Sequence, residues 1–336
     1  MATERGAALA GRWAGLRARW RRDRGRYDRA TLIGYWAAWR ASGSAPALLR
    51  LATFRRDLGR PLPGRWIAPL RDAAPALAPN VRRLALGLLA EAAPASLVTM
   101  PPQALADAAV RIPALAARGP APCTPAARRL AQLHDEQADR RAAFADWLAR
   151  RRDAGGLCVV GNAATLRGGT LGTAIDAHAA VLRFNAFRGD ADPVDIGRRT
   201  DVWVAKGDYR GERPAGIAWA VHSGPDPRFR VVDPETLALL AGEDTPVLTV
   251  PLAVWRTLVR ELEAPPSAGL LTLAWLRTLL GGWEGLHCAG IGGGLGPGGR
   301  YHAAIAAKPP GRRHAWAREQ ALLARWQAEG LRCLDR

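Results

Sequence analysis

Gly161 and Asn162 are the first residues with a candidate chemical role, because they follow the apolar string LCVV at the end of an expected strand. At such a turn the backbone can come close to a ligand. The string VVGNAATLRGG is not GxGxxG, since other residues occupy the two glycine places after Gly161, and it lacks the GK[ST] of a Walker loop. A dinucleotide dehydrogenase and a P-loop kinase are therefore disfavoured. Taken alone, the turn fits a ligand site and a simple helix cap equally well.

Histidine supplies the other candidate chemistry, because the unperturbed pKa of imidazole lies nearest neutral pH. His302 follows the Gly-rich string GIGGGLGPGGRY, which by itself indicates only flexibility. His314 follows two prolines and an arginine near an expected helix start, where its ring could reach a ligand. The other histidines carry no motif and are expected to be structural or exposed: His134, His178, His222 and His287.

The elements that must position these residues begin at Leu157, where short apolar strands alternate with helical stretches. This order predicts an α/β domain with a mainly parallel sheet. The carboxyl ends of such strands face the ligand, so the residues after Val160, Phe184 and Ile291 are expected to line the site. The expected strands are LCVVGN, AVLRFN, TDVWVA, IAWAVH, RFRVVD, PVLTVP and GLHCAGIG.

One helix of this region has clear ends. Pro266 and Ser267 should begin an apolar helix that Gly281 and Gly282 end, just before the last expected strand.

The first 152 residues have a different pattern, with helical stretches broken by proline-rich connectors. The glycine pair at 155–156 is the expected boundary. We therefore expect a helical N-terminal region at 1–152 and an α/β domain at 153–336, with part of 80–150 completing the second domain.

A basic stripe at 11–30 holds eight Arg and two Asp, and places Trp13, Leu16 and Trp20 on one helix face. Such a stripe could lie on an anionic bilayer. The simpler interpretation, which we favour here, is a solvated basic face whose Trp and Leu pack against the rest of the protein. Nucleic-acid binding is not expected, because no recognised binding motif accompanies the charge.

Composition excludes several classes of protein. The chain has 336 residues, 49% of them hydrophobic and 23% charged, which is typical of a globular protein and not of a disordered or collagen-like one. The net charge of +18 favours phosphate-bearing or membrane-surface partners, although 46 of the 48 basic residues are Arg, which is partly compositional bias. No signal peptide or membrane span is predicted, so the expected location is cytoplasmic.

The four cysteines are widely spaced, without a CxxC pair or metal-ligand spacing, and free thiols are expected. They are Cys123, Cys158, Cys288 and Cys333.

The string from 157 to 203 resembles the long sialylmotif of the sialyltransferases, glycosyltransferase family 29. In that family a strand is followed by Gly-Asn, then by Ile-Asp, Val-Leu-Arg-x-Asn and Asp-Val-Gly-x-x-Thr. The matching residues are Gly161, Asn162, Leu166, Gly172, Ile175, Asp176, Val181, Leu182, Arg183, Asn185, Asp195, Gly197 and Thr200.

Further motifs of the family follow in order. The string Pro266-Ser267-Ala268-Gly269 and the strand ending at Gly290-Ile291-Gly292 resemble the short sialylmotif. Tyr301-His302 resembles the third motif, and His314 with Glu319 resembles the very short motif His-x-x-x-x-Glu. The resemblance covers 157 to about 336, whereas 1–150 resembles no family that we know.

The resemblance implies a Rossmann-like fold, a variant of the GT-A type, and an inverting, metal-independent transfer from a CMP-linked sugar without a cofactor. Asn162 and Asn185 would bind the CMP part of the donor beside Gly161, and His302 would contact its phosphate. His314 would be the general base that deprotonates the acceptor hydroxyl. The expected donor contacts also include Ser267, Ala268, Gly269 and Tyr301, with Asp176, Arg183 and Glu319 as supporting residues.

Two departures from the family pattern matter. Animal members join two cysteines whose aligned places here are Leu157 and Trp283, and we expect the nearby Cys158 and Cys288 not to be bonded, as in a reducing compartment. Ala268 stands where a hydroxyl residue is usual.

A direct pair between His314 and Glu319 requires His314 to precede the helix, because residues five apart do not share a helix face.

The sequence leaves alternative donors and functions open. A CMP-Kdo donor competes with CMP-sialic acid, since both are CMP-linked 2-keto sugar acids. The chain could also be a degenerate CMP-binding protein without turnover, or an interaction protein whose basic N-terminal region binds anionic lipid or nucleic acid. The favoured reading is a bacterial-type enzyme that acts on a glycan or glycolipid, located in the cytoplasm or peripherally at the inner face of the membrane through 11–30.

Overall fold

The computed structural model describes residues 2–101, 105, 128, 132–187, 192–206, 209, 211–224, 245–292 and 314–334. Packing divides these residues into two compact units. The first holds the described residues up to Glu136 together with Val259–Pro265, and the second holds the others from Gln137 on.

The division falls ahead of helix α9 (Gln137–Gly155) and not at its end, where the sequence pattern changes. The reason is packing: the ring of Phe144 on α9 lies 5.1 Å from that of Trp219 and 5.5 Å from that of Trp275, both in the second unit. The mainly charged helix α9 thus makes an apolar contact with the sheet through Phe144.

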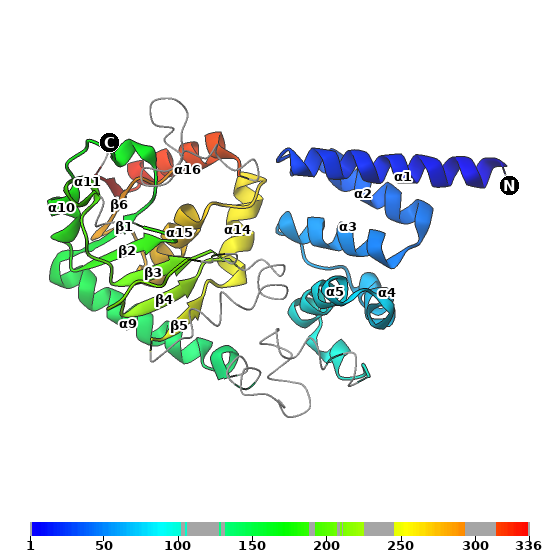
Figure 1. Cartoon of the computed structure of the whole chain (residues 1–336), viewed down its shortest axis with the longest axis horizontal. Coiled ribbons are helices and arrows are strands. Elements are labelled where there is room, and N and C mark those ends of the chain that lie inside the picture. The colour runs from blue at the N-terminus through cyan, green and yellow to red at the C-terminus, as the bar shows by residue number, and fades with distance from the viewer. Residues whose placement is uncertain are drawn as a thin grey trace. The chain divides into compact units, whose positions relative to one another are not determined.

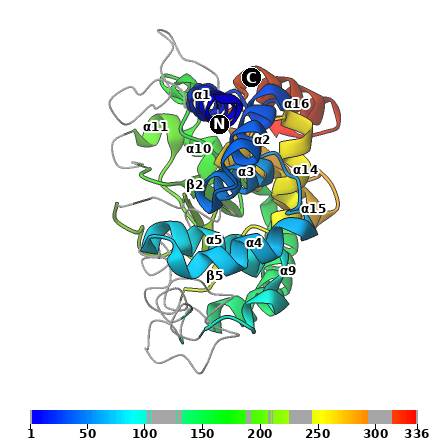
Figure 2. The same cartoon turned by 90° about the vertical axis from the view of Figure 1, so that its right-hand side faces the viewer.

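The first unit is helical in all its described residues, apart from connectors. Asp28 caps α2 by accepting a hydrogen bond from the Thr31 backbone N–H (2.9 Å), and Gly43 ends that helix in the left-handed conformation. Its core includes the fully buried Phe54 and Leu86. Its helices are α1 (Ala2–Asp23), α2 (Arg29–Ser42), α3 (Ala45–Asp57), α4 (Gly64–Ala73), η1 (Ala74–Ala76), α5 (Pro79–Ala92) and η2 (Pro94–Leu97), with α4 and α5 side by side in Figures 1 and 2.

The expected packing of the basic stripe is wrong. Trp13, Leu16 and Trp20 are 70%, 59% and 53% exposed. α1 instead turns its small residues inward, with Gly11 and Ala18 buried. No helix among the described residues has both the length and the apolar character needed to cross a membrane.

The second unit is built on a seven-stranded sheet in the order β5-β4-β3-β2-β1-β6-β7, with every neighbouring pair parallel. This confirms the predicted α/β class with a parallel sheet. The strands are β1 (Leu157–Val160), β2 (Ala180–Phe184), β3 (Val202–Ala205), β4 (Trp219–His222), β5 (Val247–Thr249), β6 (Leu286–Ala289) and β7 (Arg332–Cys333).

Six of the seven expected strands are present. The expected strand RFRVVD lies outside the described residues, and the two-residue β7 was not predicted because so short a run has no recognisable pattern.

Helices lie on both faces of this sheet (Figure 1). α9 and α15 contact β1 from one side, whereas Cys158 and Val160 point to the other side and pack with Ile175 of α10 and Ile196 of α11. The helices that follow α9 are η3 (Ala164–Leu166), α10 (Gly172–Asp176), α11 (Pro193–Ile196), α14 (Leu252–Leu262), α15 (Ala268–Leu280) and α16 (Trp316–Ala328). The end of α14, from Val259 on, belongs to the first unit.

The predicted ends of α15 are confirmed. Ser267 is its N-cap residue, and Gly281 ends it with φ +75°. The helix therefore points its N-terminus toward the carboxyl edge of the sheet, as a crossover before β6 requires.

Candidate functional site

The turn after β1 is held tightly against the end of β6. The Gly161 N–H donates to the Ala289 carbonyl oxygen (2.8 Å), and a Cβ at position 161 would collide with the Gly290 carbonyl. Only glycine fits this approach. The turn at Gly161 is therefore fixed by the ends of the adjacent strands β1 and β6.

Two asparagines tie neighbouring strand ends together. The Asn162 amide nitrogen donates to the Phe184 carbonyl at the end of β2 (3.0 Å), and Asn185 Oδ1 accepts from the Lys206 N–H after β3 (2.8 Å). Each side chain keeps one polar atom, Oδ1 of Asn162 and Nδ2 of Asn185, with no hydrogen bond to any described residue. Both residues are partly exposed, so a ligand can use these atoms.

The backbone at Asn185 is in the left-handed conformation, with φ +53°. Asparagine tolerates this region better than most residues. The Asn185 carbonyl accepts a hydrogen bond from the indole N–H of the buried Trp203 (3.0 Å), which fixes the turn from the other side.

The start of α15 reaches the same edge. A Cβ at Gly269 would lie 3.2 Å from Ile291, and one at Gly161 would lie 3.0 Å from the same side chain. Ile291 thus lies between the turn after β1 and the first turn of α15. The N–H groups of Ala268 and Gly269 have no acceptor among the described residues, and helix N-termini favour anions.

Glu319 on α16 links the two motifs at the end of the chain. Its fully buried carboxylate accepts the Ser267 N–H (2.8 Å), and burial raises its pKa to about 7 even though the hydrogen bonds from Ser267 lower it. His314 precedes α16 by two residues, and its Nδ1 lies 3.9 Å from Glu319 Oε1. Glu319 therefore holds the start of α15 by direct contact and meets the imidazole at ion-pair distance.

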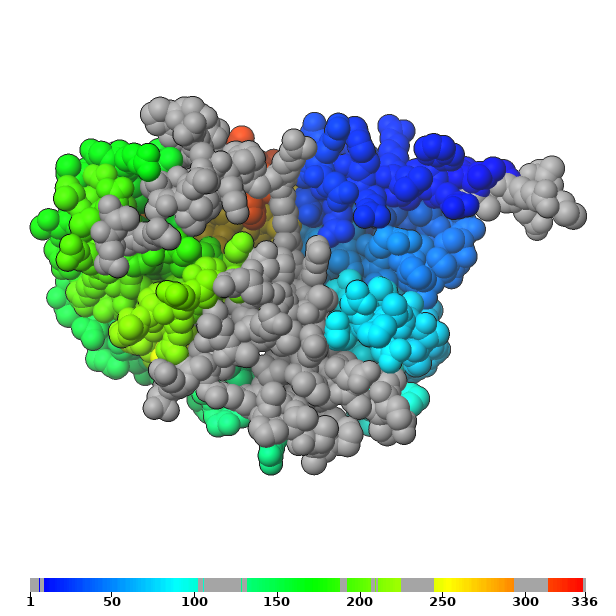
Figure 3. Space-filling view, viewed as in Figure 1, coloured from blue at the N-terminus to red at the C-terminus, as the bar shows by residue number. Residues whose placement is uncertain are grey.

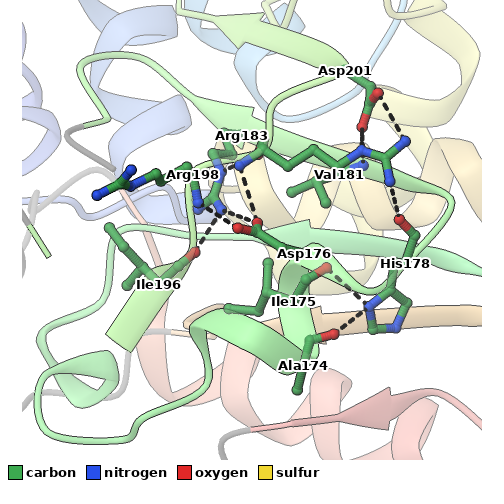
Figure 4. A network of polar contacts seen from close by, with 10 residues as sticks. Ala174, Ile175, Asp176, His178, Val181, Arg183, Ile196, Arg198 and Asp201 are labelled. Atoms are coloured by element: carbon green, nitrogen blue, oxygen red, sulfur yellow. Dashed lines mark hydrogen bonds and ion pairs between the residues drawn. The ribbon is translucent and has the colours of Figure 1, made fainter. Parts of the chain in front are cut away.

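The buried Arg183 and the partly exposed Asp176 form a polar support behind the edge (Figure 4). Arg183 is 1% exposed and donates to the Ile196 and Arg199 carbonyls (2.5 and 2.8 Å), while Asp176 accepts the N–H groups of Arg198 and Arg199 (2.8 and 3.0 Å). The two charges lie 3.7 Å apart. Burial lowers the pKa of Arg183 to about 10, and Asp176 opposes that shift.

Asp195 matches the long motif and is a further supporting residue, although the sequence alone gave it no role. Its carboxylate accepts the N–H groups of Gly168 (2.6 Å) and Thr170 (3.0 Å), and these hydrogen bonds lower its pKa. It thereby fixes the loop between β1 and α10. Its place in the long motif was the available signal.

Tyr301 and His302 lie outside the described residues, so their expected roles stay predictions. Among the other histidines, His134 is exposed and His222 is buried at the end of β4. His178 and His287 pair through their rings (Nε2 to Nδ1, 2.5 Å).

No disulfide joins Cys158 to Cys288, as expected. Cys288 is instead paired in register with Cys333 of β7, and their sulfur atoms are 2.9 Å apart. Trp283, at the place of the animal half-cystine, packs on Trp326 with ring centroids 5.0 Å apart.

Comparison with known proteins agrees with the first motif. Residues 147–208 match the family model of glycosyltransferase family 29 (sialyltransferase). This stretch contains Gly161, Asn162 and Asn185, whereas Ser267 and His314 lie beyond it. No curated protein sequence matches the chain.

Two crystal structures of a mammalian sialyltransferase are similar to part of the chain, one of them in complex with Gal-beta-1-3GalNAc-ortho-nitrophenol. Both are 19% identical and cover 53% of this chain and 68% of their own, with TM-scores of 0.41 and 0.43.

Proposed function

We propose that this chain is an inverting, metal-independent glycosyltransferase that moves sialic acid, or a related 2-keto sugar acid, from its CMP ester to a glycan hydroxyl. The observation that carries the proposal is the meeting of Asn162, Asn185 and the start of α15 at one edge of a parallel sheet, each with polar atoms that no described residue binds. The family match over 147–208 supports the same reaction class.

The donor would be held through its CMP part. The cytidine offers both donors and acceptors, which suit the remaining Oδ1 of Asn162 and Nδ2 of Asn185. The phosphodiester would lie at the N-terminus of α15, where the N–H groups of Ala268 and Gly269 offset negative charge. His302, with Tyr301 beside it, would contact the phosphate. Because Ala268 has no hydroxyl, the backbone carries this part of the binding.

The transfer step needs one base. The acceptor oxygen attacks the anomeric carbon, the bond from that carbon to the phosphate oxygen breaks, and CMP leaves with the electron pair. Attack opposite to the leaving group inverts the configuration. His314 takes the acceptor proton, and the Glu319 carboxylate 3.9 Å away stabilises the imidazolium that results. Since the phosphodiester of the donor gains only one negative charge as it becomes the phosphomonoester of CMP, the helix N-terminus and His302 would be sufficient without a metal ion.

The partners follow from this reaction. They are a CMP-linked sugar acid and a glycan or glycolipid acceptor. The proposed location is cytoplasmic, with peripheral contact at the inner face of the membrane through 11–30.

The test is CMP release by the purified full chain in EDTA, with CMP-sialic acid or CMP-Kdo, each with and without glycan acceptors. Acceptor-stimulated release from CMP-sialic acid is the expected result. Release from CMP-Kdo alone would favour the competing donor. CMP binding without release would identify a degenerate CMP-binding protein. No CMP release from either donor, together with no CMP binding in calorimetry, would reject the proposal.

A further inference from the structure

Helix α1 exposes its large apolar side chains on one face. Leu9, Trp13, Leu16 and Trp20 are 56%, 70%, 59% and 53% exposed. Their spacing of four, three and four residues places them along a single side of the helix. We call these four residues the outer face of α1.

The opposite side of α1 is made of small residues that pack tightly on α2. A Cβ at Gly11 would collide with Ala41, and one at Gly15 would lie 3.1 Å from Ala38. Gly34 of α2 meets the buried Ala18 in the same way. A helix that folds only for its own unit buries its Trp and Leu side chains and exposes the small ones. α1 does the reverse, so its outer face is suited to contact something outside this unit.

Arginines border the outer face on both sides. By helical position, Arg12 and Arg19 lie along one side of it and Arg17 along the other, and Arg24 follows directly after the end of the helix; all four are exposed. The Arg24 guanidinium lies 4.0 Å from the centre of the Trp20 ring. Figure 3 shows the side chains of the first helices, in dark blue, standing out from the surface.

The neighbouring arginines have partners within the unit. Arg21 donates to Asp28 (2.6 Å), and Arg22 lies 3.7 Å from the buried carboxylate of Asp57. Arg21 and Arg22 thus anchor α1. Of the arginines that border the outer face, Arg19 lies 3.9 Å from the exposed carboxylate of Asp23 on the same helix.

We propose that the outer face of α1 docks on an anionic lipid bilayer. Trp and Leu side chains would enter the boundary between headgroups and acyl chains, while the bordering arginines would bind lipid phosphates. Tryptophan suits this depth because its ring is apolar and its N–H is polar. This deepens the peripheral location given above, and it does not depend on transferase activity.

A second copy of this chain is a poorer occupant. Two outer faces brought together would set Arg borders of the same sign against each other, which is destabilising. A nucleic acid would use the arginines and leave the apolar stripe without a role.

The test is flotation of the full chain with vesicles of phosphatidylcholine alone or mixed with phosphatidylglycerol. The expected result is binding to the anionic vesicles only, reduced at least about tenfold by the double change W13S/W20S. The matched control is W36S, because Trp36 is 45% exposed on α2 and lies outside the outer face. Circular dichroism and CMP binding should be unchanged in both variants.

Three results would overturn the proposal. W13S/W20S could float as well as the wild type, or the wild type could stay unbound while it forms W13S/W20S-sensitive dimers in sedimentation. A bound fraction lost to competing duplex DNA, but unaffected by W13S/W20S, would also reject it. Loss of CMP release alone would not affect vesicle binding, so the transferase proposal and the membrane proposal can be rejected independently.

Discussion

The Glu319 carboxylate on α16 accepts a hydrogen bond from the backbone N–H of Ser267, which caps α15, at 2.8 Å. The carboxylate is fully buried and lies 3.9 Å from His314 Nδ1. One side chain thus joins the residue before the proposed phosphate-binding turn to the proposed base. The very short motif therefore positions the start of α15 through Glu319 and also supplies the imidazole of His314.

The raised pKa of Glu319 predicts a pH-dependent stability. The native carboxyl has a pKa of about 7 against an ordinary 4.5, so the folded state binds this proton more tightly. Stability should fall as pH rises from about 4.5 to 7 and level off above, with a total effect of about 3 kcal/mol. In E319Q, which keeps an acceptor for Ser267, this component should vanish. Urea unfolding at several pH values measures it, and parallel curves for both proteins would contradict the prediction.

Asn185 predicts two separable effects. N185A and N185G should each weaken CMP binding about tenfold, because each loses the side-chain amide. Both variants also lose the hydrogen bond from the Lys206 N–H, and N185A should be less stable than N185G by roughly 1 kcal/mol, because φ at this position is +53° and glycine adopts it freely. Calorimetry with CMP and thermal unfolding measure the two effects. Unchanged CMP affinity in both variants would remove Asn185 from the donor site.

The buried Arg183 predicts a large cost for removing its partner. D176A leaves the guanidinium without its carboxylate and frees the Arg198 and Arg199 N–H groups, so stability should fall by about 2–4 kcal/mol. R198A is the control, because only the backbone of Arg198 is hydrogen-bonded to Asp176. Chemical denaturation compares them, and equal stability of D176A and R198A would show that the network contributes little.

The paired thiols predict selective cross-linking. Cys288 and Cys333 face each other across adjacent strands with sulfur atoms 2.9 Å apart, and such strand spacing suits a disulfide. Oxidised glutathione should convert the two thiols to a disulfide and itself be reduced. Peptide mapping should find Cys288 joined to Cys333, with C158S as a control that leaves the reaction unchanged. Cross-linking that requires Cys158 would contradict the assignment.

The sequence predicted the parts of this fold that depend on local patterns. The ends of α15 followed from Ser267 and Gly281, and the strands followed from short apolar runs between turns. The side of α1 that is buried could not be predicted, because Trp13 and Gly11 lie on opposite faces and a pattern does not say which face packs. The pairing of Cys288 with Cys333 depends on strand order, which links residues far apart in sequence. Glu319 was expected to be a supporting residue, but only the structure shows that its partner is Ser267.

The central claim is transfer from a CMP-linked sugar with His314 as base. Its most direct measurement is acceptor-stimulated CMP release in EDTA by the wild type and by H314A. H134A is the control, because His134 is an exposed histidine in the helical residues 132–135 that precede α9. H314A should lose about 10²–10⁴-fold in release while its CMP affinity stays nearly unchanged, and H134A should match the wild type. Wild-type turnover by H314A would show that His314 is not the base.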